Sequence, residues 1–191
     1  MRDEAGRLRA ELARMTARPA EAGPACLMLF EIDVVGDREL YAQRLRQVLV
    51  SAVRTVIEAG VEGDRVDVSR VPSWFEGLSE GSASSTDVPV EALAGRRAYV
   101  ERREQSGWDL QEWIYCFDPD LRRWSWWDVT AGDGSTALLW VDTSGETVVP
   151  CEELWWTMFV CGARSVAVST QGARDERTDR ASIGLGLGEE L

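Results

Sequence analysis

The sequence contains no histidine, no lysine and no asparagine, so all 21 of its basic residues are arginines. Without histidine the chain has no Ser-His-Asp triad, no Cys-His dyad and no imidazole to bind a metal ion. Without lysine it has neither a Schiff-base amine nor the lysine of a phosphate-binding loop. Any catalysis would have to use carboxylates, Arg, Cys, Ser, Thr or Tyr, for example through a carboxylate-held Mg²⁺ or a general-acid pair.

Cysteine is also sparse, and long apolar runs are missing. The four cysteines, Cys26, Cys116, Cys151 and Cys161, never form a Cys-x-x-Cys pair, and this spacing favours buried free thiols. No apolar run approaches the length of a membrane span. The amino terminus carries charges where a secretory signal has an apolar core, so we expect a cytoplasmic protein.

Acidic residues outnumber basic ones by 33 to 21, which gives a net charge of −12. Proteins that bind nucleic acids or anionic membranes depend on cationic contacts to phosphate, so this balance disfavours both as partners. A basic protein partner is the better match. The alternative is that the acidity only keeps the protein soluble.

The patterning of the chain predicts an α+β fold. We expect an N-terminal helix and linker over 1–24, a single α+β domain over 25–170, and a flexible C-terminal tail over 171–191. The domain should hold a mixed, mainly antiparallel sheet of about six strands with two helices packed on it. Apolar residues at helical spacing place helices at 3–17, 38–59 and 151–161. Apolar runs and alternation place strands at 25–35, 65–71, 96–105, 136–142, 147–149 and 164–170, and the Ser- and Gly-rich stretch 76–89 is expected to be a loop.

Residues 108–129 hold five of the nine tryptophans and alternate in two halves about Asp118-Pro119-Asp120. This pattern predicts an aromatic β-hairpin. Trp113, Trp140 and Trp155 are assigned to the core. The second arm carries tryptophans on both faces, so we expect an exposed tryptophan surface that binds a protein. Its candidate partner-binding residues are Arg122, Arg123, Trp124, Trp126, Trp127 and Asp128. The alternative is that other parts of the chain cover these indoles.

Two other candidate sites rest on carboxylates. Asp33-Val34-Val35-Gly36 leaves an apolar strand and enters a long helix. It resembles the first metal-binding strand of class III nucleotidyl cyclase domains, and that resemblance implies a Mg²⁺ ligand at Asp33. The second Asp of that family has no counterpart at 68–72, and its adenine-selecting Lys is missing, so the resemblance implies a degenerate domain. A carboxylate pair for glycoside chemistry is the other possibility, with candidates at Asp109, Glu112, Asp118, Asp120 and Asp128.

Together these features favour a non-catalytic cytoplasmic interaction protein, similar in kind to an inhibitor, immunity or adaptor protein, that binds a basic protein partner. No cofactor and no metal site is expected, and a homo-oligomer is possible. The alternative is a small-ligand-binding or degenerate cyclase-like domain centred on Asp33.

Overall fold

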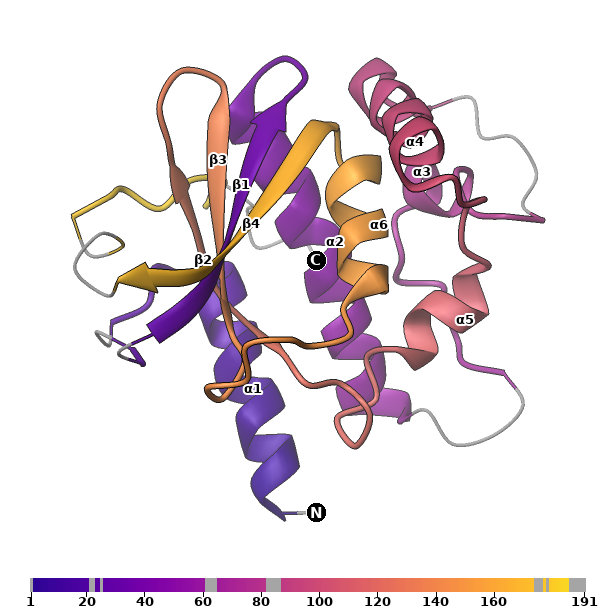
Figure 1. The fold of residues 1–191 in the computed structure, drawn as a ribbon. Helices are drawn as coiled ribbons and strands as arrows, with labels where there is room; N and C mark the ends of the chain where they lie inside the picture. Colours follow the sequence, from indigo (N-terminus) through magenta and orange to yellow (C-terminus); the bar gives the residue numbers. More distant parts are fainter. Residues whose placement is uncertain are drawn as a thin grey trace.

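A computed structural model describes residues 2–20, 23–24, 26–60, 65–81, 87–173, 177 and 179–185. In these residues four strands form one sheet in the order β2-β3-β1-β4, with every neighbouring pair antiparallel (Figure 1). The strands are β1 (Cys26–Val34), β2 (Ser125–Ala131), β3 (Thr136–Asp142) and β4 (Ala163–Ala173). The α+β class is confirmed, whereas the expected mixed sheet of about six strands is wrong.

Six helices accompany the sheet in the described residues: α1 (Arg2–Thr16), α2 (Arg38–Ala59), α3 (Ser73–Glu76), α4 (Val90–Arg103), α5 (Leu110–Tyr115) and α6 (Glu152–Val160). Helices α2, α4 and α6 contact the sheet, and α3 and α5 lie farther from it (Figure 1). Helix α1 packs against α2 and β2. The predicted helices at 3–17, 38–59 and 151–161 are therefore confirmed to within a residue or two.

Strand β1 is one of the two inner strands, as its apolar run predicts. Met28, Phe30 and Ile32 point into the main core that α2 and α6 help to form. Leu27 and Leu29 point to the opposite face, because successive strand side chains alternate. There they form a second, smaller cluster with three residues of the neighbouring strands, namely Trp127, Leu138 and Trp140. The sheet is thus buried on both faces near its centre.

The longest helix, α2, begins where the sequence places its cap. The Asp37 carboxylate accepts hydrogen bonds from the backbone N–H of Glu39 at 2.7 Å and of Leu40 at 3.0 Å. These bonds satisfy donors that the first helical turn leaves unpaired. At the other end Gly60 adopts a φ of 68°, a left-handed value that favours glycine.

The first arm of the predicted aromatic hairpin is a helix, α5. Asp109 caps it by accepting from Gln111 N at 2.8 Å and Glu112 N at 3.2 Å. Trp113 and Phe117 lie four residues apart, a spacing that suits a helix as well as a strand, and their rings are 4.9 Å apart in the core. The hairpin prediction is therefore wrong for 108–117. Its second arm is strand β2, which pairs with β3.

Three other predicted strands are wrong in the described residues. At 65–71 the side chain of Gln111 binds both backbone groups of Val66, at 2.9 and 3.1 Å, in place of a neighbouring strand. Residues 96–103 belong to α4, whose buried positions Ala92, Gly95 and Tyr99 follow helical spacing. Residues 147–149 form a loop between β3 and α6.

The segment predicted as a flexible C-terminal tail makes defined contacts where it is described. Residues 171–173 extend β4. Ser182 pairs with Thr130 of β2 in an antiparallel bridge, and Ile183 is buried. The segment therefore runs along the outer edge of β2. Residues 174–176, 178 and 186–191 lie outside the described residues, as do residues 82–86 of the expected 76–89 loop.

Candidate functional site

The three tryptophans expected on an exposed surface are buried. Trp124, Trp126 and Trp127 are 3%, 0% and 5% exposed. The expectation of an exposed tryptophan pair is therefore wrong, because Trp124 and Trp126 belong to the main core and Trp127 belongs to the cluster on the second face of the sheet. A Cβ added to Gly23 would lie 2.4 Å from the Trp127 ring, so the linker before β1 lies directly against this indole. Of the tryptophans assigned to the core, Trp113 and Trp140 are fully buried and Trp155 is half-buried.

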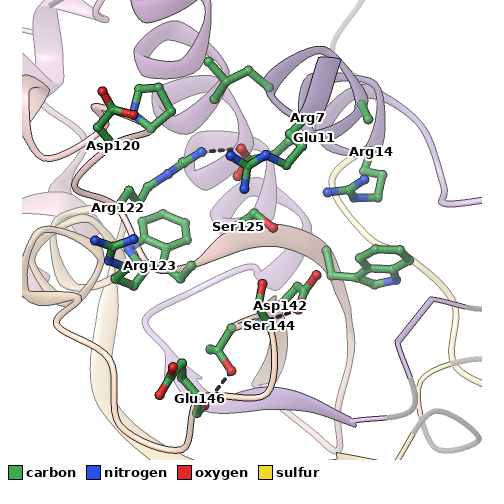
Figure 2. Close-up of a pocket in the computed structure, with 16 residues that line it drawn as sticks. Arg7, Glu11, Arg14, Asp120, Arg122, Arg123, Ser125, Asp142, Ser144 and Glu146 are labelled. Atoms are coloured by element: carbon green, nitrogen blue, oxygen red, sulfur yellow. Dashed lines mark hydrogen bonds and ion pairs between the residues drawn. The ribbon is translucent and has the colours of Figure 1, made fainter. Parts of the chain in front are cut away.

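A half-open cavity of about 520 Å³ lies between α1, the segment that leads into β2, and the turn after β3 (Figure 2). We call it the α1 cavity. Its lining residues are Arg7, Leu8, Ala10, Glu11, Arg14, Pro119, Asp120, Arg122, Arg123, Trp124, Ser125, Trp127, Asp142, Thr143, Ser144 and Glu146. The volume is in the range of small-molecule or anchor-residue sites.

The α1 cavity brings together four of the six predicted partner-binding residues: Arg122, Arg123, Trp124 and Trp127. The other two, Trp126 and Asp128, do not line it. The cavity also brings in residues from α1 and from the 142–146 turn that sequence reasoning missed. These segments lie far apart in the chain, and the only local signal was the helical spacing of Arg7 and Glu11.

A buried ion pair forms one wall of the cavity. Glu11 and Arg122 form a salt bridge, and their side chains are 2% and 4% exposed. The other Glu11 oxygen accepts from the backbone N–H of Trp126 at 2.6 Å. Arg122 Nη1 has no hydrogen-bond partner among the described residues. One glutamate therefore connects α1 to both the wall of the cavity and the start of β2, as Figure 2 shows for the Arg122 contact.

The indole faces in the wall are already covered by arginines of the protein itself. The Arg14 guanidinium lies 4.4 Å from the centre of the Trp127 ring, and that of Arg122 lies 4.8 Å from the centre of the Trp124 ring. Both distances suit cation–π attraction. A cation from a partner would have to displace these arginines to stack here, so its contacts are expected at carboxylates instead.

Three carboxylates lie around the cavity without an ion pair among the described residues: Asp120, Asp142 and Glu146. Asp120 and Glu146 are exposed, and Asp142 is half-buried and accepts from Ser144 N at 2.8 Å. Arg7 and Arg123 are exposed on the same rim. The rim thus presents unpaired charges of both signs, and its carboxylates are open to cationic groups from outside.

Asp128 lies in a separate buried network. Its carboxylate is 3.1 Å from Arg46 Nη2 and 3.6 Å from Arg177 Nη1, and it accepts from Ser182 Oγ at 2.7 Å. Burial raises the pKa of Asp128, and the hydrogen bond from Ser182 opposes that shift. This network connects α2, β2 and the C-terminal segment, and so gives Asp128 a role inside the fold.

Groups suited to acid–base or nucleophilic chemistry do not line the cavity. Glu153 is 6% exposed, and burial raises its pKa while the hydrogen bond from Trp124 Nε1, at 2.6 Å, lowers it. Burial also raises the pKa of Cys116 to about 11 and of Cys151 to about 12. Thiols with such pKa values remain protonated at neutral pH and are poor nucleophiles.

The Asp33 carboxylate is already bound within the protein. It accepts from Arg164 Nη1 at 2.8 Å and from Ser135 Oγ at 3.0 Å. Asp33 does not line the α1 cavity. Within the described ranges, no group of three or more Cys, Asp or Glu side chains is placed to hold a metal ion.

Comparison with protein-family models, with curated proteins and with solved structures gave no match. None of the helices in the described part of the chain has both the length and the apolar composition of a membrane span. The features of the chain that bear on function are the α1 cavity and the net charge.

Proposed function

We propose that this protein is a non-catalytic interaction module, similar in kind to an inhibitor, immunity or adaptor protein, that binds a basic protein partner at the α1 cavity. The proposal rests on one observation: unpaired carboxylates, arginines and tryptophans line the same half-open cavity. The tryptophans act as rigid walls beneath the surface rather than as exposed contacts.

Charge supports the choice of a basic partner. The chain has a net charge of −12, so it attracts cationic proteins over distances near the Debye length, which is about 8 Å at physiological salt. Asp120, Asp142 and Glu146 then provide local acceptors for Arg or Lys side chains of the partner. Such charges raise the association rate and select the partner more than they raise affinity.

The rigidity of the site also supports binding. The Glu11–Arg122 pair and the Glu153–Trp124 hydrogen bond fix two walls of the cavity from within. A pre-organised site loses little conformational entropy when a partner docks, so more of the contact energy contributes to affinity.

Charge reversal at the rim tests the proposal. Immobilised wild-type protein should capture a basic protein from a lysate of the source cells, and the double variant Asp120→Arg, Glu146→Arg should not. A matched double variant, Glu76→Arg with Glu101→Arg, reverses two exposed acids outside the cavity and should retain the partner. Equal loss in both double variants would show that total charge, and not the α1 cavity, holds the partner; full retention in the rim variant would refute the proposed site.

A further inference from the structure

The two edge strands of the sheet, β2 and β4, differ in whether another segment pairs with their outer sides. The outer edge of β2 is covered by the C-terminal segment, through Ala131 N to Ala181 O at 3.1 Å and Ile183 N to Val129 O at 3.0 Å. The other edge is β4, and no strand in the described residues pairs with its outer side. An open edge strand presents unpaired N–H and C=O groups that can bind another strand.

Strand β4 lacks most of the features that usually protect such an edge; the exception is helix α4, which contacts β4 and lies against Gly162 just before the strand. It spans eleven residues, 163–173, and has no proline. Its one charged residue, Arg164, lies near the start and pairs with Asp33 of the same chain. Between Ser165 and Ser169 the pairing with β1 is regular, and the irregularities lie outside this stretch. Short edges, charges, proline and bulges are the common protections, so the middle of β4 is suited to pairing.

The middle of β4 has a palindromic sequence, Ser165-Val166-Ala167-Val168-Ser169. If two copies pair antiparallel about a two-fold axis at Ala167, each serine faces a serine and each Val166 faces the other copy's Val168. Such a contact is isologous, so one strand supplies both sides of the interface. Val168 is 47% exposed, and cross-strand contact with a second valine would bury it.

We propose that β4 is a self-association edge, through which two copies of this chain join their sheets into one continuous eight-stranded antiparallel sheet with the two-fold axis at Ala167. The contact uses the strand's backbone groups and its small uncharged side chains. It is independent of the α1 cavity, since no residue of β4 lines that cavity.

Charge sets the conditions in which the dimer forms. Two copies of a chain with a net charge of −12 repel each other, and salt screens that repulsion. Self-association should therefore strengthen as salt is raised. Binding of a basic partner at the α1 cavity should instead weaken with salt, so the two interactions have opposite salt dependence.

Sedimentation of the full chain at low and high salt tests the inference. A species of twice the 21.3 kDa chain mass should increase with protein concentration and salt. Val168→Arg places a charge at the centre of the edge and should give a monomer. Val148→Arg, at a position that is 85% exposed after β3, is the matched control and should dimerise as the wild type does. A monomer at all concentrations and salts, or equal dimerisation by both variants, would overturn the inference.

A cysteine at the axis tests the register. Ala167→Cys should form an intermolecular disulfide on mild oxidation, since residues directly opposite in an antiparallel pair lie about 4.5 to 5.5 Å apart at Cα, within disulfide reach. Thr147→Cys, also exposed but outside the strand, should form none beyond the wild-type background. An equal yield at both positions would contradict a two-fold axis at Ala167.

Discussion

Adding one methyl group at Gly95 should separate two helices of the fold. Gly95 lies on the inner side of α4, where α4 crosses the end of α6. A Cβ built there would lie 1.8 Å from the Phe159 carbonyl oxygen, 2.9 Å from its carbonyl carbon and 3.1 Å from Gly162 Cα. Carbon and oxygen approach no closer than about 3.3 Å, so the backbones would have to separate by about 1.5 Å.

The expected cost is set by two opposing effects. Alanine in a helix interior is favoured over glycine by about 1 kcal/mol. Overpacking against a rigid backbone costs more, with about 1 to 3 kcal/mol typical once the structure has shifted. With the helix gain subtracted from the overpacking cost, we expect Gly95→Ala to lower the free energy of unfolding by up to about 2 kcal/mol, and Tm to fall by about 2 to 4 °C per kcal/mol for a chain of this size.

Gly6 provides the matched control. It lies within α1, and an added Cβ there would meet no atom within 4 Å. Gly6→Ala should raise the unfolding free energy by about 0.5 to 1 kcal/mol, since only the helix preference acts. Urea unfolding followed by circular dichroism measures both variants. If Gly95→Ala stabilises the protein as much as Gly6→Ala, the close packing of α4 on α6 is wrong.

Two further variants test the buried charges. Glu11→Gln removes the charge that compensates Arg122 and should lower the unfolding free energy by about 3 to 5 kcal/mol. The double variant Glu11→Gln, Arg122→Met should recover much of this loss. If it recovers none, the two side chains are not coupled. Burial raises the pKa of Glu153, so the ionised carboxylate is disfavoured in the folded state. The protonated side chain therefore contributes stability below the ordinary pKa of glutamate, and this contribution is lost as the pH rises through the raised pKa. Glu153→Gln keeps an oxygen for the Trp124 N–H and should flatten the decline in stability from mildly acidic to neutral pH; an unchanged pH profile in urea unfolding would contradict this.

The helices and strands that were predicted correctly are those in which the capping residues, the apolar pattern and the tertiary contacts all favour the same structure. Helix α2 has a capping aspartate, an apolar stripe and a closing glycine at Gly60, and each signal points to the same boundaries. Strands β1 and β3 are short apolar runs with strong strand preference. These are the parts of the fold that a local pattern is able to determine.

The wrong strand predictions come from residue patterns that also fit another local structure. Trp113 and Phe117 fit one face of a strand and also one face of a helix, and the cap from Asp109 decides for the helix. Val66 alternates like a strand residue, but a distant glutamine side chain binds its backbone. The outcome in each case depends on a contact that the local alternation does not include.

The candidate site was predictable only in part. Arg122, Arg123, Trp124 and Trp127 were identified because Trp and Arg are common in binding sites. The burial of the indoles could not be deduced, because the segments that cover them come from the two ends of the chain. Glu11 was missed for the same reason, since its partner Arg122 is 111 residues away.

The most direct test of the central claim is a photo-cross-link from the cavity to the bound partner. A photo-reactive amino acid at Arg123, which is exposed on the rim of the α1 cavity, should yield a covalent adduct with the captured basic protein. The same amino acid at Arg96, which is exposed on α4, should yield none. An adduct at position 96 with none at position 123 would contradict the claim that the partner binds at the α1 cavity.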